Sequence, residues 1–431
     1  MRRATTGSGS QRVARTILHG LLRRIRFDRL TIRDGPRTCA FAGEPSAIDP
    51  LEATIVVHDR RAYTAVLTEG SIGLGRGYIE GWWTSPDPVA VVAVLIRNMA
   101  PIDALRNRWQ LVTGPVTDRI RMTLPRHSRQ RNRDDIAAHY DIGNEFFTLF
   151  LDETMTYSSA VFEELDGNDD EPLADASRRK NALLFDTVGL DGQHHLLEIG
   201  TGWGGLALRA AQQVGCRVTT TTISAEQFRE ANRRVAAAGE DDRITVLDSD
   251  WRDLAGVYDR VISVEMIEAV DWRDYDAYFA TIEHCLTPDG FAAIQAICLP
   301  DARWPRAKNS EDFIKRFVFP NGFLPSVAAI SESVARATEM RIVGVEDFGP
   351  HYAETLRRWR ATFLSRLDAV QALGLDSRFC RLWDFYLAYC EAAMRERHCT
   401  VVQIVLAGSA APTRLAAEGR SRVHPQGSFG S

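Results

Sequence analysis

Several features are missing from this sequence of 431 residues, and each absence excludes a class of protein. No window reaches about 18 uninterrupted apolar residues, so we expect no membrane-spanning helix. The seven cysteines show neither C-x-x-C spacing nor a paired framework, which favours reduced, mostly buried thiols and a cytosolic protein. The basic N-terminus lacks the long apolar core and small-residue cleavage site of a signal peptide, so we do not expect secretion.

A strong positive charge is also absent. The 57 acidic and 52 basic residues give a net charge of -5, which argues against a general nucleic-acid partner. Hydrophobic residues make up 45% of the chain and charged residues 25%, as in ordinary soluble globular proteins. The length has room for two or three domains and at least one full-sized core.

The charge that is present is unevenly distributed. The first 33 residues hold nine arginines and a single acid, Asp28. Val13, Ile17 and Leu21 recur at i, i+4, i+8 spacing, which predicts a basic amphipathic helix. Such a helix either lies in the interface of an anionic membrane or packs on its own domain with solvated arginines. An arginine-rich linker between Asp103 and Asp135 is similarly either solvated or turned toward phosphate headgroups.

The region after Arg178 alternates apolar runs with helical stretches, which is typical of βαβ units and a parallel sheet. Seven candidate strands fit one doubly wound sheet: His195–Ile199, Arg217–Thr222, Ile244–Asp248, Tyr258–Val264, Phe291–Cys298, Met340–Asp347 and Thr400–Ala407. Earlier in the chain, a strand at Ala53–Val57 and a glycine-punctuated stretch before Trp82 indicate a small α+β domain. The tail from Pro412, rich in glycine, serine and arginine, is predicted to be disordered.

The strongest local signal is a glycine-rich turn, Gly200–Gly205, between an apolar strand and a predicted helix, Leu206–Val214. Glycines let the backbone approach a ligand closely at the carboxyl edge of a sheet. A dinucleotide site would need an acid at the end of the second strand, where this chain has Thr219–Thr222. Together with the preceding Glu198, the turn resembles the first motif of class I S-adenosylmethionine-dependent methyltransferases.

Asp250 and Trp251 follow the third predicted strand. In adenosine-binding methyltransferases this position often presents a polar side chain and a ring to the adenine, and an indole can stack on a purine. The alternatives are a core position for Trp251 and a solvated loop for the acids of this region.

Longer motifs run along the chain in a fixed order: His139–Phe147, Leu151–Ala160, Glu198–Gly205, Thr222–Ser224 with Gln227, Val264–Val270, Phe319–Gly322 and Pro350–Leu356. In these motifs the sequence resembles the cyclopropane-fatty-acyl-phospholipid synthase family, which includes the mycolic acid methyltransferases. The resemblance extends over residues 30–407.

That resemblance implies methyl transfer from S-adenosylmethionine to a cis double bond in an unsaturated acyl chain of a membrane phospholipid. Attack by the alkene leaves a carbocation, so the site needs aromatic faces and a base. The resemblance makes Tyr352 the ring nearest this charge and places His139 beside the methyl donor. With the glycine-rich turn, it predicts ten cofactor-binding residues: Tyr157, Ser158, Glu198, Gly200, Gly202, Trp203, Thr222, Gln227, Asp250 and Trp251.

The resemblance also implies a bound bicarbonate as the base. Glu268, Tyr352 and the backbone of Ile297 match its ligands, whereas Ser159 stands at a cysteine position and Gln295 at a histidine position. Serine and glutamine can still donate hydrogen bonds to an anion, so bicarbonate is a second candidate cofactor. Direct proton loss closes a cyclopropane ring. A prior hydride shift gives an exocyclic methylene, the precursor of 10-methyl-branched (tuberculostearic) acids, and both outcomes stay open.

These observations predict an α/β protein, with the Rossmann-like seven-stranded sheet of class I methyltransferases after a small α+β domain. The expected divisions are a basic segment (1–29), a lipid-binding domain with a basic linker (30–125), a methyltransferase domain (126–411) and a disordered tail (412–431). We expect a cytosolic enzyme without a metal that docks on the anionic inner face of a membrane, and an oligomer is compatible with the sequence. A methyltransferase for a soluble small molecule and an inactive lipid-binding homologue are the alternatives.

Overall fold

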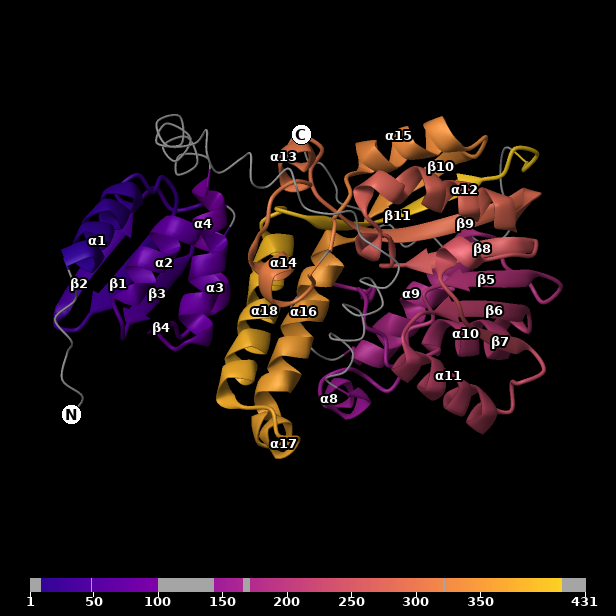
Figure 1. Ribbon diagram of the computed structural model, residues 1–431, viewed down its shortest axis with the longest axis horizontal. Coiled ribbons are helices and arrows are strands. Elements are labelled where there is room, and N and C mark those ends of the chain that lie inside the picture. The colour runs from indigo at the N-terminus through magenta and orange to yellow at the C-terminus, as the bar shows by residue number, and fades with distance from the viewer. Residues whose placement is uncertain (1–8, 48, 100–142, 166–170, 321, 413–431) are drawn as a thin grey trace. The chain divides into compact units, whose positions relative to one another are not determined.

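The computed structural model describes residues 9–47, 49–99, 143–165, 171–320 and 322–412 (Figure 1). The chain forms two compact units. The first combines Met1–Asp135 with Asn309–Gly322 and Leu356–Cys399, and the second contains Ile136–Lys308, Phe323–Thr355 and Thr400–Ser431. Two segments from the expected methyltransferase range therefore group with the N-terminal residues.

A seven-stranded sheet forms the centre of the second unit, with the order β10-β11-β9-β8-β5-β6-β7 (Figure 1). Its strands are β5 (His195–Ile199), β6 (Arg217–Thr222), β7 (Ile244–Asp248), β8 (Tyr258–Val264), β9 (Leu286–Cys298), β10 (Arg341–Asp347) and β11 (Thr400–Ala407). Strands β5 to β9 are parallel to their neighbours within that set, whereas β11 is antiparallel to both β9 and β10. The predicted fold class is confirmed, and the main difference is that β9 begins at Leu286 rather than Phe291.

Helices pack against both faces of this sheet because alternate strand residues point to opposite sides. Leu197 belongs to the apolar cluster that includes Ile282 of α12, and Leu196 belongs to the cluster that includes Leu184 of α9. The helical elements of this unit are α8 (Asn144–Thr148), α9 (Leu173–Thr187), α10 (Gly205–Arg209), η1 (Ala210–Val214), α11 (Ala225–Ala238), η2 (Trp251–Asp253), η3 (Ile267–Ala269), η4 (Trp272–Asp274), α12 (Tyr275–Cys285), α13 (Trp304–Ala307), α15 (Val327–Ala337) and the start of α16 (Gly349–Ser365).

The first unit contains a four-stranded sheet with the order β2-β1-β3-β4. Its elements are α1 (Gly9–Leu22), β1 (Arg29–Asp34), β2 (Arg37–Ala42), β3 (Glu52–Val57), α2 (Arg61–Glu69), α3 (Ser71–Ile79), β4 (Trp83–Thr84), α4 (Pro88–Arg97), α14 (Phe313–Phe317), the end of α16, α17 (Leu367–Ala372) and α18 (Ser377–Arg395). The glycine-punctuated stretch follows α2 and forms α3. Glycine is needed at Gly73 because a Cβ there would lie 1.9 Å from the carbonyl oxygen of Ala65.

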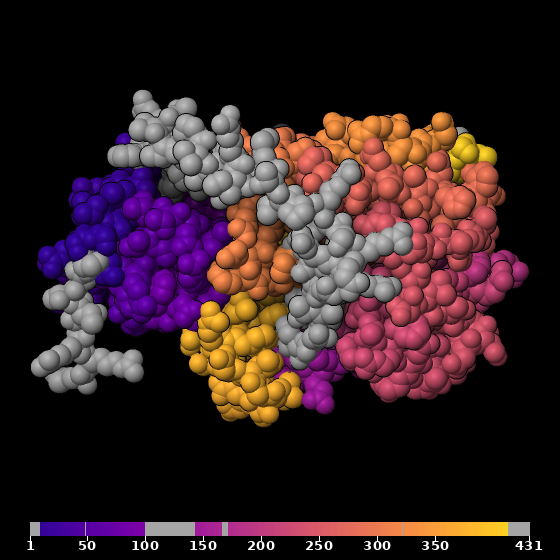
Figure 2. Space-filling model, viewed as in Figure 1, coloured from indigo at the N-terminus to yellow at the C-terminus, as the bar shows by residue number. Residues whose placement is uncertain are grey.

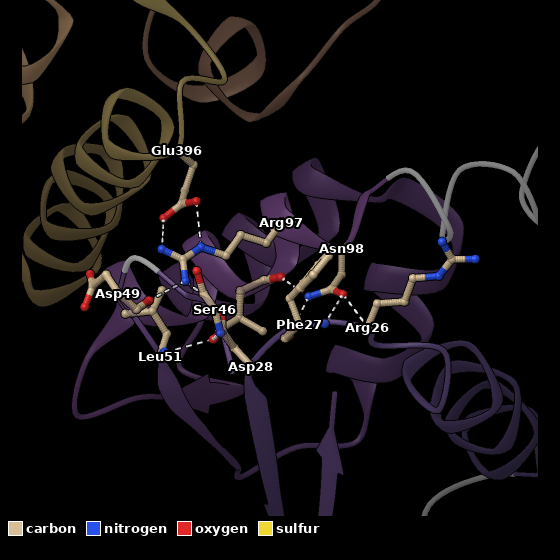
Figure 3. A network of polar contacts seen from close by, with 10 residues as sticks. Arg26, Phe27, Asp28, Ser46, Asp49, Leu51, Arg97, Asn98 and Glu396 are labelled. Carbon is tan, nitrogen blue, oxygen red and sulfur yellow. Dashed lines mark hydrogen bonds and ion pairs between the residues drawn. The ribbon is translucent and has the colours of Figure 1, made fainter. Parts of the chain in front are cut away.

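A network of polar contacts centred on Arg97 joins segments of the first unit that are distant in the sequence (Figure 3). The Arg97 guanidinium donates to both carboxylate oxygens of Glu396, at 2.7 and 2.8 Å, and to Asp28 at 2.6 Å. Asp28 also accepts hydrogen bonds from the backbone N–H groups of Ser46 and Leu51. Burial alone would raise the pKa of Asp28, but these hydrogen bonds and the Arg97 charge hold it below its ordinary value.

Helix α1 contributes one face to the first unit and leaves the other at the surface. Ala14 and Leu22 are buried, and the His19 ring lies edge-on to Phe41 at 5.1 Å. Val13 and Ile17, one turn apart, are 59% and 41% exposed. In Figure 2 the indigo atoms of this N-terminal part form a broad area of the visible surface.

All seven cysteines are free thiols, five of them buried, as their spacing predicts. In the part of the chain that the structure describes, no helix has the length and apolar character needed to cross a membrane.

Candidate active site

The glycine-rich turn leaves the carboxyl end of β5, where the ends of β6 and β8 also lie. The N–H groups of Gly200 and Thr201 both donate to the carbonyl oxygen of Thr221, at 3.1 and 3.0 Å. Gly200 has φ 103° and Gly202 has φ 51°, conformations that favour glycine. A Cβ at Gly202 would meet no atom within 4 Å, so a ligand can approach the backbone there.

The predicted cofactor residues of β6 and α11 are brought together next to this turn. The Thr222 hydroxyl donates to Oε1 of Gln227 at 3.0 Å and accepts from the Ser224 N–H at 3.1 Å. Ser224 also caps α11 by accepting from the Gln227 N–H. This local bonding fixes both polar side chains at the sheet edge.

Asp250 and Trp251 follow β7, and both already have protein partners. Asp250 accepts from the Arg252 N–H at 3.0 Å and pairs with the Arg252 guanidinium at 3.1 Å. Trp251 is 7% exposed and lies edge-on to Tyr278, with the Arg252 guanidinium 4.4 Å from its ring centre. Their contact with the cofactor stays a prediction, because Trp251 also belongs to the apolar core.

The segment before α9 passes over the start of α10. A Cβ at Gly205 would lie only 2.7 Å from the carbonyl oxygen of Thr154, so only glycine fits this approach. Asp152 holds the segment by accepting from the Thr154 N–H at 2.7 Å and from the Ser177 hydroxyl at 2.9 Å. The segment thereby carries Tyr157 and the two serines that follow it toward the site.

Two of the predicted cofactor residues pack within this region. Tyr157 lies edge-on to Phe147, with ring centres 5.4 Å apart. Trp203 is 2% exposed, and its indole N–H donates to Asn144 at 2.7 Å. The indole therefore ties α8 to the glycine-rich turn, and its contact with the cofactor stays a prediction.

A buried lysine that the sequence analysis did not single out lies behind these residues. Lys180 of α9 is 2% exposed, and its ammonium donates to the Ser158 hydroxyl at 3.1 Å. Burial lowers the pKa of Lys180 to about 8, although the charges of Glu265 and Glu198 oppose this shift. A lysine enclosed among carboxyl groups indicates an electrostatic role.

Glu198, at the end of β5, is 3% exposed. Burial raises its pKa to about 8, and a hydrogen bond from Thr220 and the charge of Lys180 only partly offset this. Its Oε2 atom has no hydrogen-bond partner among the described residues. A buried carboxyl oxygen without a partner is costly unless a ligand satisfies it.

Two carboxyl groups three residues apart occupy the carboxyl end of β8. Oε1 of Glu265 accepts from the Ser159 N–H and from Nε2 of Gln295, both at 2.8 Å, and Tyr352 also donates to this carboxylate. Burial raises the pKa of Glu265, and these three donors together with the Lys180 charge oppose the shift.

Glu268, in η3, is the second member of this pair. Its Oε1 accepts from the Ile297 N–H at 2.5 Å, and its Oε2 has no partner among the residues described. Burial and the neighbouring Glu265 charge raise the pKa of Glu268 to about 8. Glu268 is therefore mainly protonated at neutral pH before a ligand binds.

The Gln295 amide is oriented from its other side. Its carbonyl oxygen accepts from Nε2 of Gln403 at 3.0 Å, across the β9–β11 pair in which the two residues are directly opposite. Because Gln403 donates to the oxygen, the Gln295 NH₂ group is turned toward Glu265. Gln403 is a positioning residue that the sequence analysis also missed.

The structure thus brings Ser159, Gln295 and Tyr352 together around Glu265, which the sequence analysis did not single out. The predicted Glu268, three residues further along the chain, accepts from the Ile297 N–H. One available signal was the pair of acids three residues apart, directly after a buried strand. His139 lies outside the described residues.

The site therefore concentrates buried carboxyl groups beside an open glycine-rich turn. Glu198, Glu265 and Glu268 outnumber Lys180, and unpartnered oxygens of Glu198 and Glu268 remain to be satisfied. A cationic ligand would relieve the raised pKa values of these carboxyls. Among the described residues, no group of three or more His, Cys, Asp or Glu side chains is placed to hold a metal ion.

The fold and this site define a class I S-adenosylmethionine-dependent methyltransferase, and the acidic cluster fits a sulfonium cofactor. The family model described as mycolic acid cyclopropane synthetase matches residues 127–404. The chain belongs to this family.

The comparisons also identify individual relatives. A tuberculostearic acid methyltransferase, UfaA1 of Mycobacterium tuberculosis, is 41% identical over 88% of this chain and 87% of its own length. The cyclopropane-fatty-acyl-phospholipid synthase of Escherichia coli K12 is 33% identical over 82% of this chain and 87% of its own. The structure of a mycolic acid cyclopropane synthase, CmaA1, complexed with SAH and CTAB has a TM-score of 0.59 and 28% identity, over 66% of this chain and 99% of that one.

Proposed function

We propose that the protein methylates the cis double bond of unsaturated acyl chains of membrane phospholipids, with S-adenosylmethionine as the donor. The observation that carries this proposal is the carboxyl pair Glu265 and Glu268, with Tyr352 donating to Glu265, at the strand edge that also holds the glycine-rich turn. An ordinary nucleophilic substrate needs no such group of carboxylates and aromatic rings. An alkene does, because its alkylation leaves a carbocation.

The residues have distinct parts in this chemistry. The glycine-rich turn, Thr222, Gln227 and Glu198 would hold S-adenosylmethionine, which supplies an electrophilic methyl group when bound. The alkene π electrons form the new carbon–carbon bond, and positive charge develops on the chain. The Tyr352 ring and the carboxylates stabilise that charge, because aromatic faces and fixed anions attract a cation in a site with little water.

Two products are compatible with the same first step. Loss of a proton from the new methyl group with ring closure gives a cyclopropane, whereas a prior hydride shift gives a methylene group. The higher identity to a tuberculostearic acid methyltransferase, 41% against 33% for the cyclopropane synthase, supports the methylene product as the second candidate.

The proposal includes docking on an anionic membrane surface through α1. Val13 and Ile17 are exposed on the same face of α1, Arg12 is exposed in the same helix, and Arg23 and Arg24 are exposed directly after it. Apolar side chains with neighbouring arginines match the boundary between acyl chains and anionic headgroups. We therefore propose a cytosolic protein that associates peripherally with the inner face of the membrane.

The test is to incubate the purified protein with S-adenosylmethionine and vesicles of unsaturated phosphatidylglycerol, and to analyse the lipids. Mass spectrometry should show the gain of one CH₂, and proton NMR should distinguish ring from methylene, which have equal mass. Activity on a soluble small molecule without vesicles would contradict the proposal. Cofactor binding with no turnover on any unsaturated lipid would instead indicate an inactive lipid-binding homologue.

A further inference from the structure

We infer that Glu265 is the catalytic base of this protein, a built-in carboxylate that stands where the family resemblance implies a bound bicarbonate. This inference rests on the proposed function, because only alkylation of an alkene requires a base at this point.

The first support is the hydrogen-bonding around Glu265. The Ser159 N–H, the Gln295 NH₂ and the Tyr352 hydroxyl all donate to its carboxylate. The resemblance assigned these three positions to bicarbonate. Since the donors are already directed at Glu265, a separate anion would compete for them and would meet the Glu265 charge. The residues present therefore do not fit bicarbonate.

The second support is the backbone. Glu265 has φ 49°, in the left-handed region that side chains rarely adopt. Such a conformation costs on the order of 1 kcal/mol in a non-glycine residue, and such outliers cluster at functional sites. Glycine would adopt it without strain. This position nevertheless holds a glutamate, whose carboxylate accepts from three donors. A functional role for the carboxylate would explain why the strain is retained.

The third support is the difference between the two carboxyls. Glu265 accepts from three donors, whereas Glu268 accepts from Ile297 and retains a free oxygen among the described residues. Neighbouring carboxyls cannot both ionise cheaply, so the one with more hydrogen-bond donors carries the charge. Burial raises the pKa of both groups, but its three donors and the Lys180 charge oppose the rise in Glu265, whereas the Glu265 charge adds to the rise in Glu268. The three donors directed at Glu265 therefore assign the ionised state of the pair, and with it the role of proton acceptor, to Glu265.

The step balances without another reactant. The alkene bonds to the donated methyl carbon, the carbon–sulfur bond breaks, and its electron pair stays on sulfur. A C–H bond of the new methyl group then breaks, and its electrons close the ring or, after a hydride shift, form the exocyclic double bond. The proton passes to Glu265, which later releases it to solvent.

The experiment compares the wild-type protein with Glu265→Gly and Glu265→Gln, with and without bicarbonate, in CO₂-free buffer. Wild-type turnover should not depend on bicarbonate. Glu265→Gly should remain folded, because glycine suits the backbone, and should lose on the order of 100-fold in kcat, as expected for a lost general base. Bicarbonate should restore part of this loss in Glu265→Gly but not in Glu265→Gln, where the side chain still fills the site.

The matched control is Arg397→Gly, which places glycine at a second residue with positive φ, 51°, exposed and outside the site, and should leave kcat unchanged. Loss of wild-type activity in CO₂-free buffer, or full activity of Glu265→Gly without bicarbonate, would overturn the inference.

A binding measurement separates this inference from the proposed function. Carbon-13 NMR with labelled bicarbonate should detect a bound anion in Glu265→Gly and none in the wild type. If the wild type methylates no lipid, the proposed function fails. This binding comparison still decides whether Glu265 occupies the anion position, because saturable binding to the wild type would contradict it.

Discussion

Each unit contains an enclosed cluster of charged side chains, and the two clusters are built in opposite ways. Around Arg97, the carboxylates of Asp28 and Glu396 share a guanidinium, and hydrogen bonds lower the pKa of Asp28. In the candidate active site, three carboxyl groups lie near the single ammonium group of Lys180, and the pKa values of Glu198 and Glu268 rise to about 8.

The difference separates a structural cluster from a functional one. Charges that are paired and hydrogen-bonded hold distant segments together, here α4 with the end of α18. Carboxyl groups without enough cationic partners resist ionisation in the free protein and favour a ligand of positive charge. Mutations in the Arg97 cluster should therefore change stability, and mutations in the candidate active site should change activity.

The largest effect is expected from Glu268→Gln. The amide is nearly isosteric with the protonated acid that predominates at neutral pH, so the free energy of unfolding should hardly change. It cannot ionise to stabilise the cationic transition state, and kcat for lipid methylation should fall by about 10²–10⁴-fold. Product formation measured beside a thermal unfolding curve checks both. Undiminished turnover would exclude Glu268 from the site.

Tyr352→Phe sharpens the same test, because it retains the ring but removes a donor to Glu265. We expect most lipid methylation to be lost in a folded protein. Turnover equal to that of the wild type would mean that the hydroxyl has no part in catalysis.

The structural cluster should respond in the reverse way. Arg97→Met keeps the apolar stem but leaves Asp28 enclosed without its cation, which should lower the free energy of unfolding by about 3 kcal/mol. The folded fraction should retain its kcat. Urea unfolding and turnover at low temperature measure these quantities, and a loss of kcat without a loss of stability would refute the contrast.

The excess of carboxyls predicts a pH effect on cofactor binding. The folded pKa values of Glu198 and Glu268 are about 8, against an ordinary value of 4.5, so the free protein holds extra protons between these limits. The free energy of unfolding that these protonated carboxyls contribute is present at low pH and is lost as the pH rises toward 8. A sulfonium lowers both pKa values, so binding should release protons and strengthen as the pH rises across this range.

Calorimetry in two buffers of different ionisation enthalpy measures the released protons directly. Release should decrease in Glu268→Gln, with Glu163→Gln as an exposed-carboxylate control. Proton uptake, or release that is unchanged in Glu268→Gln, would show that the site carboxyls do not respond to the cofactor charge.

The smallest effect is expected at α1. Val13→Asp with Ile17→Asp removes exposed apolar side chains and adds negative charge, so binding to anionic vesicles should weaken by about tenfold or more, at about 1 kcal/mol per charge. Vesicle sedimentation measures this, and stability should not change. Equal binding by the double variant would assign membrane contact to another surface.

The sequence predicts the main sheet well, because buried parallel strands are apolar runs set between helical stretches. It does not predict the π-helical turn η1, which follows α10 where one helix, Leu206–Val214, is expected. In the first unit, glycines that suggest turns instead allow close helix packing, as at Gly73. The same residue type serves both purposes, and only tertiary contacts distinguish them.

The sequence predicts several residues of the site but not the hydrogen bonds between them. Motif positions indicate Ser159, Gln295 and Tyr352, yet their common partner depends on the backbone conformation at Glu265. Lys180 and Gln403 act through contacts between distant segments, with Gln403 separated from Gln295 by 108 residues. No local sequence pattern predicts such contacts.

The left-handed backbone at Glu265 has a genetic consequence. Glutamate and glycine codons differ at their middle base, so one nucleotide transition converts a resident carboxylate into an unstrained residue with space beside it. An enzyme that borrows a dissolved ion and one that carries its own proton acceptor are then a single point mutation apart. An enzyme of this kind could gain or lose its need for dissolved bicarbonate through this one substitution, and the protein would stay folded in either case.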